Sequence, residues 1–142
     1  MLTGLEIYTK KSALQDQIKD AGFFQPYHEA VAKKKLYVRE EEMVAWYLAA
    51  GFLTRGKKGV EEGGGTVMVR VRQVTCRQHE REGVGKGLEA FADFARKTEP
   101  GILTFAIFTR KKAEDEILVY VRYRERERMH KFEESPEHQN FW

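Results

Sequence analysis

The order of segments between residues 66 and 124 limits what this chain can fold into more than any other feature does. Apolar residues recur there at every second position in three places, and at every third or fourth position in one, which predicts three strands and a helix. The segments are, in order, strand 66–76, helix 84–96, turn Thr98-Glu99-Pro100-Gly101, strand 102–109, hairpin turn 110–115 and strand 116–124. This order is typical of the split β-α-β-β half of an α+β domain with an antiparallel sheet, whose open face needs a second layer.

A charged segment follows from about residue 125, in which Met129 and Phe132 make the short apolar stripe of a further helix. Ser135-Pro136 interrupts this helix before the aromatic end Phe141-Trp142. A closing strand would be expected next, so the sequence as far as Trp142 predicts a sheet with one exposed edge.

The first 60 residues are set apart by the glycine-rich stretch 61–65, which reads as a linker. The apolar pattern of these residues predicts short helices and strands, and the helical pieces lie between two strands, so that the overall order is strand, helix, strand. The predicted segments are strand 5–9, a helix from residue 12, a helical piece 26–34, a helical turn 40–43 and the apolar run 46–54 as a strand. We expect the run 46–54 to fill the exposed sheet edge, either in its own chain or in a partner.

Composition narrows the class of protein. The chain has 142 residues and a formal net charge of +3, spread evenly along its length, whereas nucleic-acid binders concentrate basic residues on one face. Its single cysteine, Cys76, rules out an intramolecular disulfide and suits a reducing compartment. No apolar run approaches the ~20 residues of a membrane span, and no signal-peptide pattern is present. We therefore expect a cytoplasmic protein that binds neither nucleic acid nor membranes.

With these elements in place, the chain resembles the antibiotic-biosynthesis monooxygenase (ABM) family, over about residues 66–142. The resemblance lies in the valine-rich first strand, in the helix opening, in the turn before the second strand and in the third strand. The last three are Gly83-Val84-Gly85-Lys86-Gly87-Leu88, Thr98-Glu99-Pro100-Gly101 and Val119-Tyr120-Val121-Arg122-Tyr123-Arg124. It implies a ferredoxin-like dimeric α/β barrel with an antiparallel sheet. Residues 1–60 resemble a partial strand-helix-strand segment of the same domain, and 66–142 a copy lacking its last strand.

The same resemblance implies a cofactor-independent monooxygenase of secondary metabolism. Such a protein oxidises a small aromatic compound, an anthrone or a phenolic polyketide, with dioxygen in an apolar pocket, and it needs no flavin or metal. A haem-degrading branch of the family uses a haem-ligating histidine, and Phe132 occupies the helix position where we would expect it. We therefore expect no cofactor, a small aromatic ligand and a homodimer. The alternative is a non-catalytic dimeric barrel that binds a small ligand or serves as an assembly partner.

Three histidines are candidates for the catalytic base: His130 and His138 near the C-terminus, and His28 in the first part of the chain. Imidazole is the side chain best suited to exchange a proton near neutral pH. No histidine pair has the spacing of metal ligands on a helix, so a metal site is not expected. For each of the three, a surface histidine or a satisfied core histidine is the competing interpretation.

Aromatic side chains are the candidates for binding the substrate, since a ring can stack on a planar ligand. The candidates are Phe91, Phe105, Tyr120, Phe132 and Trp142. Ordinary packing of a hydrophobic core explains the same residues equally well, so the pattern leaves both interpretations open.

Overall fold

The computed structural model describes residues 6–8, 10–37, 44–56, 66–77, 79–111 and 113–142. The chain divides into two compact units, Met1–Met43 and Val44–Trp142. Among the described residues, no helix is long and apolar enough to cross a membrane. The cytoplasmic location stays a prediction.

The first unit contains helices α1 (Lys11–Ile18) and α2 (Phe24–Lys34), neither of which has a buried residue. Asp20 shapes the turn between them, because its carboxylate accepts hydrogen bonds from the backbone N–H groups of Gly22, Phe23 and Phe24. Both predicted helices are confirmed. The predicted strand 5–9 is not seen at residues 6–8, and the predicted turn 40–43 and linker 61–65 lie outside the described residues.

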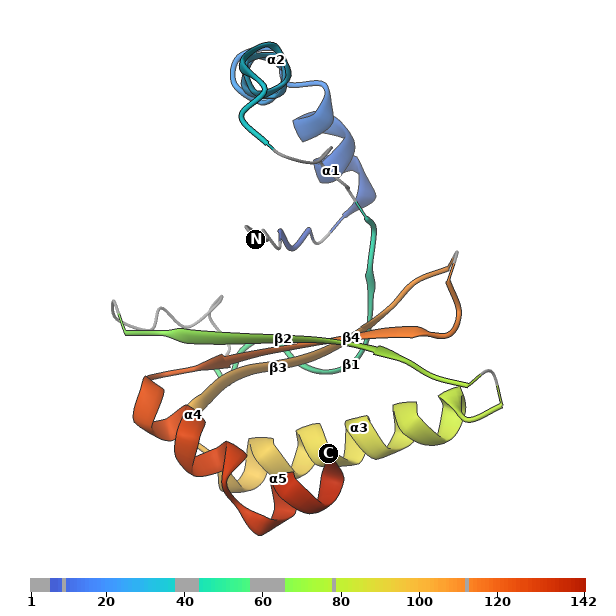
Figure 1. The fold of residues 1–142 in the computed structure, drawn as a ribbon, viewed down its shortest axis with the longest axis vertical. Coiled ribbons are helices and arrows are strands. Elements are labelled where there is room, and N and C mark those ends of the chain that lie inside the picture. Colours follow the sequence, from blue (N-terminus) through green and yellow to red (C-terminus); the bar gives the residue numbers. More distant parts are fainter. Residues whose placement is uncertain (1–5, 9, 38–43, 57–65, 78, 112) are drawn as a thin grey trace. The chain divides into compact units, whose positions relative to one another are not determined.

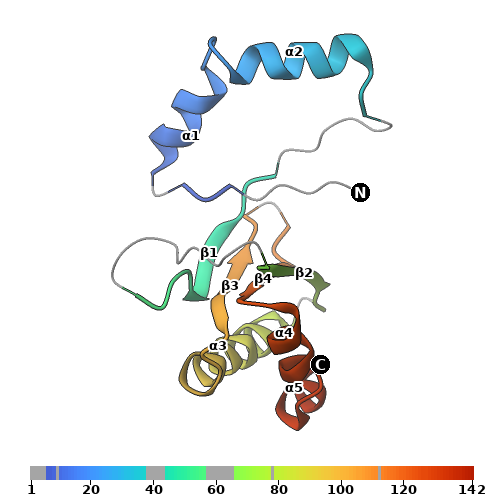
Figure 2. The same ribbon diagram turned by 90° about the vertical axis from the view of Figure 1, so that its left-hand side faces the viewer.

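The second unit is a four-stranded antiparallel sheet with helices on one face (Figures 1 and 2). The strand order is β1-β3-β4-β2, and all three neighbouring pairs are antiparallel. The elements are β1 (Tyr47–Phe52), β2 (Met68–Thr75), α3 (Arg81–Thr98), β3 (Ile102–Thr109), β4 (Glu116–Tyr123), α4 (Arg126–Glu133) and α5 (Pro136–Phe141). The predicted α+β class with an antiparallel sheet is confirmed.

The core lies between the sheet and the helices, where alternate residues of β3 and β4 meet one stripe of α3. Phe105, Ile107 and Val119 from the sheet pack with Leu88 and Phe91 from α3, and all five are buried. Strand β3 is apolar on both faces because it is central, with β1 on one side and β4 on the other. Cys76 belongs to the same core, as expected for a small apolar side chain.

Strand β2 turns two arginines, Arg70 and Arg72, toward the helices, while Val69 and Val71 face the other way. Arg70 pairs with Val121 and Arg72 with Val119, so these four side chains share the helix-facing side of the sheet. Val69 and Val71 point to the opposite face, where they are 49% and 43% exposed. The half-buried character of the predicted strand is therefore real, but Val69 and Val71 do not contribute to the core under the helices, against which Met68 and Val74 pack.

The predicted strand 46–54 is confirmed as β1, and it pairs within its own chain, beside β3. Strand β1 thus lies at the β3 edge of the sheet, which is not the edge that we expected this run to fill. Helix α3 connects β2 to β3, and β4 lies between these two strands. If α4 and α5 connected β4 to a closing strand in the same way, with β2 between the two, that strand would lie beside β2. The backbone explains the choice, because Gly51 has φ +90° and a Cβ there would stand 2.1 Å from the carbonyl oxygen of Phe105. Only glycine lets β1 approach β3 this closely.

Arg55, just after β1, fastens this strand to the end of α3. Its guanidinium donates hydrogen bonds to the carbonyl oxygens of Ala95 and Arg96, at 3.0 and 2.7 Å, and also to those of Glu99 and Ile102. Carbonyls at a helix C-terminus have no partner within the helix, and the helix dipole favours a cation there. One side chain thus supplies hydrogen-bond donors to carbonyl oxygens at the end of α3 and at the start of β3.

We predict that Arg55→Ala lowers the free energy of unfolding by about 2–3 kcal/mol, because several charge-assisted hydrogen bonds are lost together. Urea denaturation followed by circular dichroism would measure the change. Arg96→Ala is the matched control, since both arginines lie over the Phe52 ring, Arg55 at 5.2 Å and Arg96 at 5.4 Å, but Arg96 is exposed. We expect it to cost less than about 1 kcal/mol. Equal losses in the two variants would contradict the role given to Arg55.

Candidate functional site

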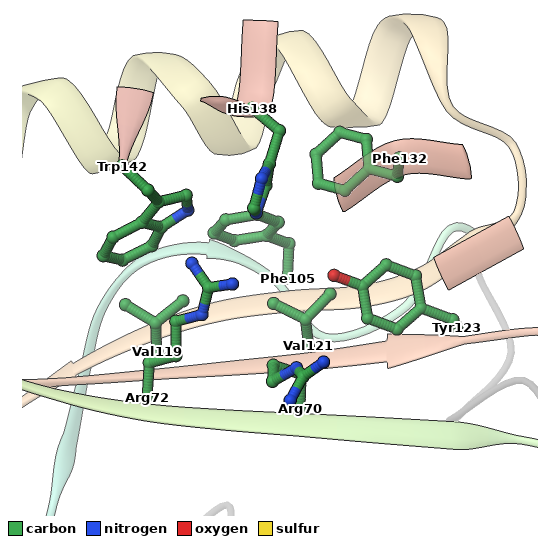
Figure 3. A pocket seen from close by; sticks show the side chains of 9 residues that line it. All are labelled: Arg70, Arg72, Phe105, Val119, Val121, Tyr123, Phe132, His138 and Trp142. Atoms are coloured by element: carbon green, nitrogen blue, oxygen red, sulfur yellow. The ribbon is translucent and has the colours of Figure 1, made fainter. Parts of the chain in front are cut away.

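A small cavity lies between the sheet and the last two helices (Figure 3). Its volume is about 10 Å³, which is room for roughly one water molecule. Strands form its floor and α4, α5 and the residue after them form its roof. The lining residues are Arg70, Arg72, Phe105, Val119, Val121, Tyr123, Phe132, His138 and Trp142.

The break between α4 and α5 places His138 in this roof. Ser135 ends the first helix by donating its hydroxyl to the carbonyl of Phe132 at 2.7 Å, and it caps the second by accepting the backbone N–H of His138 at 3.3 Å. Pro136 follows at the first position of α5, where its missing N–H costs nothing. The stacked rings of Phe91 and Phe141, 4.4 Å apart, hold α5 against α3.

His138 is buried among aromatic rings, with 6% of its surface exposed. The rings of Phe132 and Phe91 lie 5.3 and 6.0 Å from its imidazole. Burial lowers the pKa of His138, and the charge of Arg72 lowers it further, while Glu133 acts in the opposite direction. The imidazole is therefore neutral at physiological pH and able to accept a proton.

Tyr123 brings a second polar group to the cavity. Its side chain is 1% exposed, and its hydroxyl points into the space beneath Phe132 (Figure 3). Burial raises the pKa of Tyr123, and the nearby Glu133 carboxylate raises it further. The group therefore stays a phenol, which can donate a hydrogen bond to an oxygen in the cavity.

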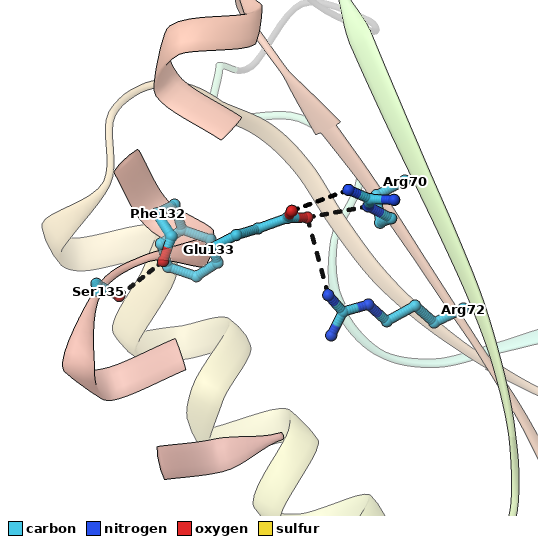
Figure 4. Close-up of polar contacts among 5 residues, drawn as sticks. All are labelled: Arg70, Arg72, Phe132, Glu133 and Ser135. Atoms are coloured by element: carbon cyan, nitrogen blue, oxygen red, sulfur yellow. Dashed lines mark hydrogen bonds and ion pairs between the residues drawn. The ribbon is translucent and has the colours of Figure 1, made fainter. Parts of the chain in front are cut away.

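Two arginines, Arg70 and Arg72, line the cavity, and the Glu133 carboxylate on α4 pairs with them (Figure 4). Glu133 accepts two hydrogen bonds from Arg70, at 3.0 and 2.9 Å, in the paired geometry that a guanidinium and a carboxylate favour. Arg72 approaches the same carboxylate only to 3.8 Å. Two positive charges and one negative charge leave this group with a net charge of +1.

The arrangement joins a neutral base, a phenol and a cation above a hydrophobic floor. Such a set can take a proton from an acidic group and hold the anion that results. Among the described residues, no three histidine, cysteine, aspartate or glutamate side chains are grouped so that they could hold a metal ion.

The sequence profile of the family described as antibiotic biosynthesis monooxygenase matches residues 68–142, which is more than half of the chain. The chain belongs to the antibiotic biosynthesis monooxygenase family. No match was found among proteins of curated function.

Solved structures share the fold of this ABM protein. They include candidate monooxygenases from Fusobacterium nucleatum (TM-score 0.71, 8% identity) and Lactobacillus acidophilus (TM-score 0.62, 14% identity). In each case the match covers 94% of this chain but 58% of the other. A candidate antibiotic biosynthesis monooxygenase from Bacteroides thetaiotaomicron matches 54% of this chain and 72% of its own (TM-score 0.50, 16% identity). The ferredoxin-like fold is thereby confirmed, while the division into segments 1–60, 61–65 and 66–142 stays a prediction.

Four of the residues that the sequence singled out meet in the cavity of this ABM protein. His138, a candidate base, lies beside the candidate binding residues Phe105, Phe132 and Trp142. Phe91 stands behind them, in contact with the rings of Phe132 and His138 but not on the cavity wall. Their roles in binding or catalysis stay predictions.

The remaining candidates lie elsewhere. Tyr120 pairs with Val71 and so points to the opposite face of the sheet. His130 is exposed on α4 and outside the cavity lining. His28 belongs to the first unit, where its ring lies 4.3 Å from Phe24. The cavity thus supports His138 as the base in preference to the other two.

Sequence reasoning missed three polar residues of the cavity lining, Arg70, Arg72 and Tyr123. It also missed Glu133, the partner of Arg70. The signal was present for the arginines, because they alternate with Val69 and Val71 in one strand. Alternation alone does not tell which side of a strand faces the helices, and the apolar side is the usual assumption.

We predict that acid weakens this protein through His138. The folded-state pKa lies below the ordinary value of 6.5, so the unfolded chain binds this proton more readily. The stability that His138 contributes is complete above pH 6.5 and is lost as the pH falls through its folded-state pKa. An NMR titration should give a midpoint below 6.5 for the imidazole signal that disappears in His138→Gln. A midpoint above 6.5 would contradict the burial argument.

Proposed function

We propose that this ABM protein is a cofactor-independent monooxygenase that oxidises a small aromatic compound, an anthrone or a phenol, with dioxygen. The observation that carries the proposal is a buried, neutral imidazole at His138, placed over a hydrophobic floor in a member of this family. The base is His138, Phe105 and Phe132 contact the aromatic rings of the substrate, and Trp142 lies at the edge of the cavity.

The reaction needs no reductant besides the substrate. His138 removes a proton from an activated CH₂ group, and the carbanion adds to dioxygen to form a C–O bond and a peroxide anion. The imidazolium returns its proton to this peroxide. The second C–H proton then leaves as the O–O bond breaks, so that CH₂ and O₂ become C=O and H₂O. Tyr123 and Arg72 stabilise the negative charge while it exists.

Oxygen uptake with an anthrone or a naphthol tests the proposal. We predict that His138→Ala lowers the rate at least about a hundredfold, the usual contribution of a general base. His79→Ala is the control, since the His79 side chain is 77% exposed and does not line the cavity. An uptake no greater than that of buffer for every aromatic tried would exclude the monooxygenase function.

His130→Ala separates the base assignment from the function itself. If this variant loses activity and His138→Ala keeps it, the protein is a monooxygenase with a different base. Absorbance of the purified protein adds a second check, because a flavin spectrum or a haem Soret band would contradict the cofactor-free reaction.

A second function is a non-catalytic dimeric barrel that binds a small ligand or an assembly partner. The size of the cavity favours it, because about 10 Å³ admits no aromatic ring without movement of the walls. Aromatic binding without oxygen uptake would select this function.

We also propose that the protein is a homodimer that covers the second face of its sheet. Leu48, Val69 and Val71 lie on that face and are 50%, 49% and 43% exposed. Leu48 lies on β1 at one edge of the sheet and the two valines lie on β2 at the other edge. Large apolar side chains exposed on one face of a sheet are typical of an interface. The β2 edge beside it has no strand partner among the described residues.

We predict that Val71→Glu converts the dimer to a monomer in sedimentation velocity, because a two-fold interface would bring two buried carboxylates together. Val71→Thr, which keeps the shape of the side chain, should remain a dimer. A wild-type protein that sediments as a monomer, or a Val71→Glu variant that stays dimeric, would contradict this interface.

A further inference from the structure

The cavity has a closed interior and an exposed mouth. Phe105, Phe132 and Tyr123 are each no more than 2% exposed. The mouth is formed by Trp142, which is 45% exposed, and by Arg70 and Arg72, whose side chains are 43% and 29% exposed. A ligand that enters must therefore pass these three side chains.

The two arginines of the mouth differ in how fully they are bonded. Arg70 is held by both oxygens of Glu133. Arg72 makes no hydrogen bond shorter than 3.5 Å to the described residues, and the Glu133 oxygen nearest to it is 3.8 Å away. Its guanidinium instead lies 4.4 Å from the centre of the Trp142 ring, in a cation–π contact. The hydrogen-bonding capacity of Arg72 is thus largely unused.

The charge at the mouth is also unbalanced. Glu133 compensates one arginine, while His138 is neutral and Tyr123 is protonated, so a single positive charge remains. A partly buried guanidinium with donors to spare is the usual partner of a carboxylate or phenolate oxygen.

We infer that the site takes a planar aromatic anion, whose charged oxygen binds Arg72 and whose ring replaces Trp142 over that guanidinium. The indole occupies this position in the closed cavity and leaves as the ligand enters. This inference rests on the proposed function for the location of the site, but it concerns binding and not oxidation.

The test uses two ligands of the same shape that differ in charge. 2-Naphthoate is an anion, whereas 2-naphthamide is neutral, and neither has the activated CH₂ group that the oxidation needs. We expect the wild-type protein to bind naphthoate about tenfold more tightly, the lower end of what a charge-assisted hydrogen bond contributes at a partly exposed site. Isothermal titration calorimetry measures both affinities.

Arg72→Gln should bring the two affinities to within about twofold of each other. Lys86→Gln is the matched control, because it removes one positive charge from an exposed position on α3, and it should keep the preference for the anion. Equal affinities in the wild type, or an undiminished preference in Arg72→Gln, would overturn the assignment of Arg72. The wild-type comparison needs no variant and so stands even if a variant folds poorly.

Displacement of the indole is tested by fluorescence. The chain has two tryptophans, so Trp46→Phe leaves Trp142 as the single reporter. Its emission should shift to the red on adding naphthoate, as the ring moves into water. Trp142→Ala should bind naphthoate about three- to sixfold more tightly, since no cation–π contact has to be broken. Weaker binding by Trp142→Ala would overturn the displacement.

The two proposals fail separately. Arg72-dependent binding of naphthoate without oxygen uptake from any aromatic would uphold the anion site and exclude the oxidation. Oxygen uptake from a neutral anthrone by a protein that does not distinguish naphthoate from naphthamide would exclude the anion site and leave the monooxygenase in place.

Discussion

The register of β2 is the constraint on which the rest of the second unit depends. Successive residues of a strand face opposite sides of a sheet, so a shift of one position would exchange the arginines and valines of this strand. As folded, Arg70 and Arg72 lie under the helices and Val69 and Val71 lie on the other face. Two cations cannot be packed like a hydrophobic core, because a buried charge needs a partner or water. Glu133 on α4 supplies the partner for Arg70, and the space beside Arg72 stays a cavity. The same register leaves the valines exposed, so one choice sets both the polarity of the site and the apolar character of the second face.

Much of the fold could be predicted, because it depends on local periodicity. Strands at 102–109 and 116–124 and the helix at 84–96 follow from apolar spacing, and their order, with the motifs they carry, pointed to the family. The position of β1 was harder to predict, since it depends on the φ of Gly51 and on hydrogen bonds from Arg55 to residues about 40 positions away. Neither contact leaves a pattern in the sequence. For the site, aromatic residues and His138 could be named from their type. The charged residues could not be named in this way. Arg70 and Glu133 are 63 positions apart, and each taken by itself is typical of a solvated surface.

Neutral His138 and cationic Arg72 depend on each other. The positive charge of Arg72 is one cause of the lowered pKa of His138, which keeps the imidazole free to accept a proton. Once it has done so, two positive charges face the cavity, and an anionic intermediate is favoured by both. A site of this kind binds an anion more strongly after proton transfer than before it, and an interaction that strengthens along the reaction accelerates it. Glu133 limits this effect. Without its carboxylate, the positive charges of both arginines would be uncompensated and would repel the imidazolium more strongly.

Opening the closed cavity requires only a small free energy. Releasing Trp142 from Arg72 gives up one partly exposed cation–π contact, worth about 0.5–1 kcal/mol. Releasing α5 as a whole would also break the stack of Phe91 on Phe141, for a further 0.5–1.5 kcal/mol or so, and would expose the buried His138 to water. Rotation of the indole alone is therefore the cheaper route. At about 0.5–1 kcal/mol the open form makes up roughly a sixth to a third of the molecules, which lowers the apparent affinity for a ligand only about three- to sixfold. The cavity is therefore closed in most of the molecules and can still admit an aromatic ring.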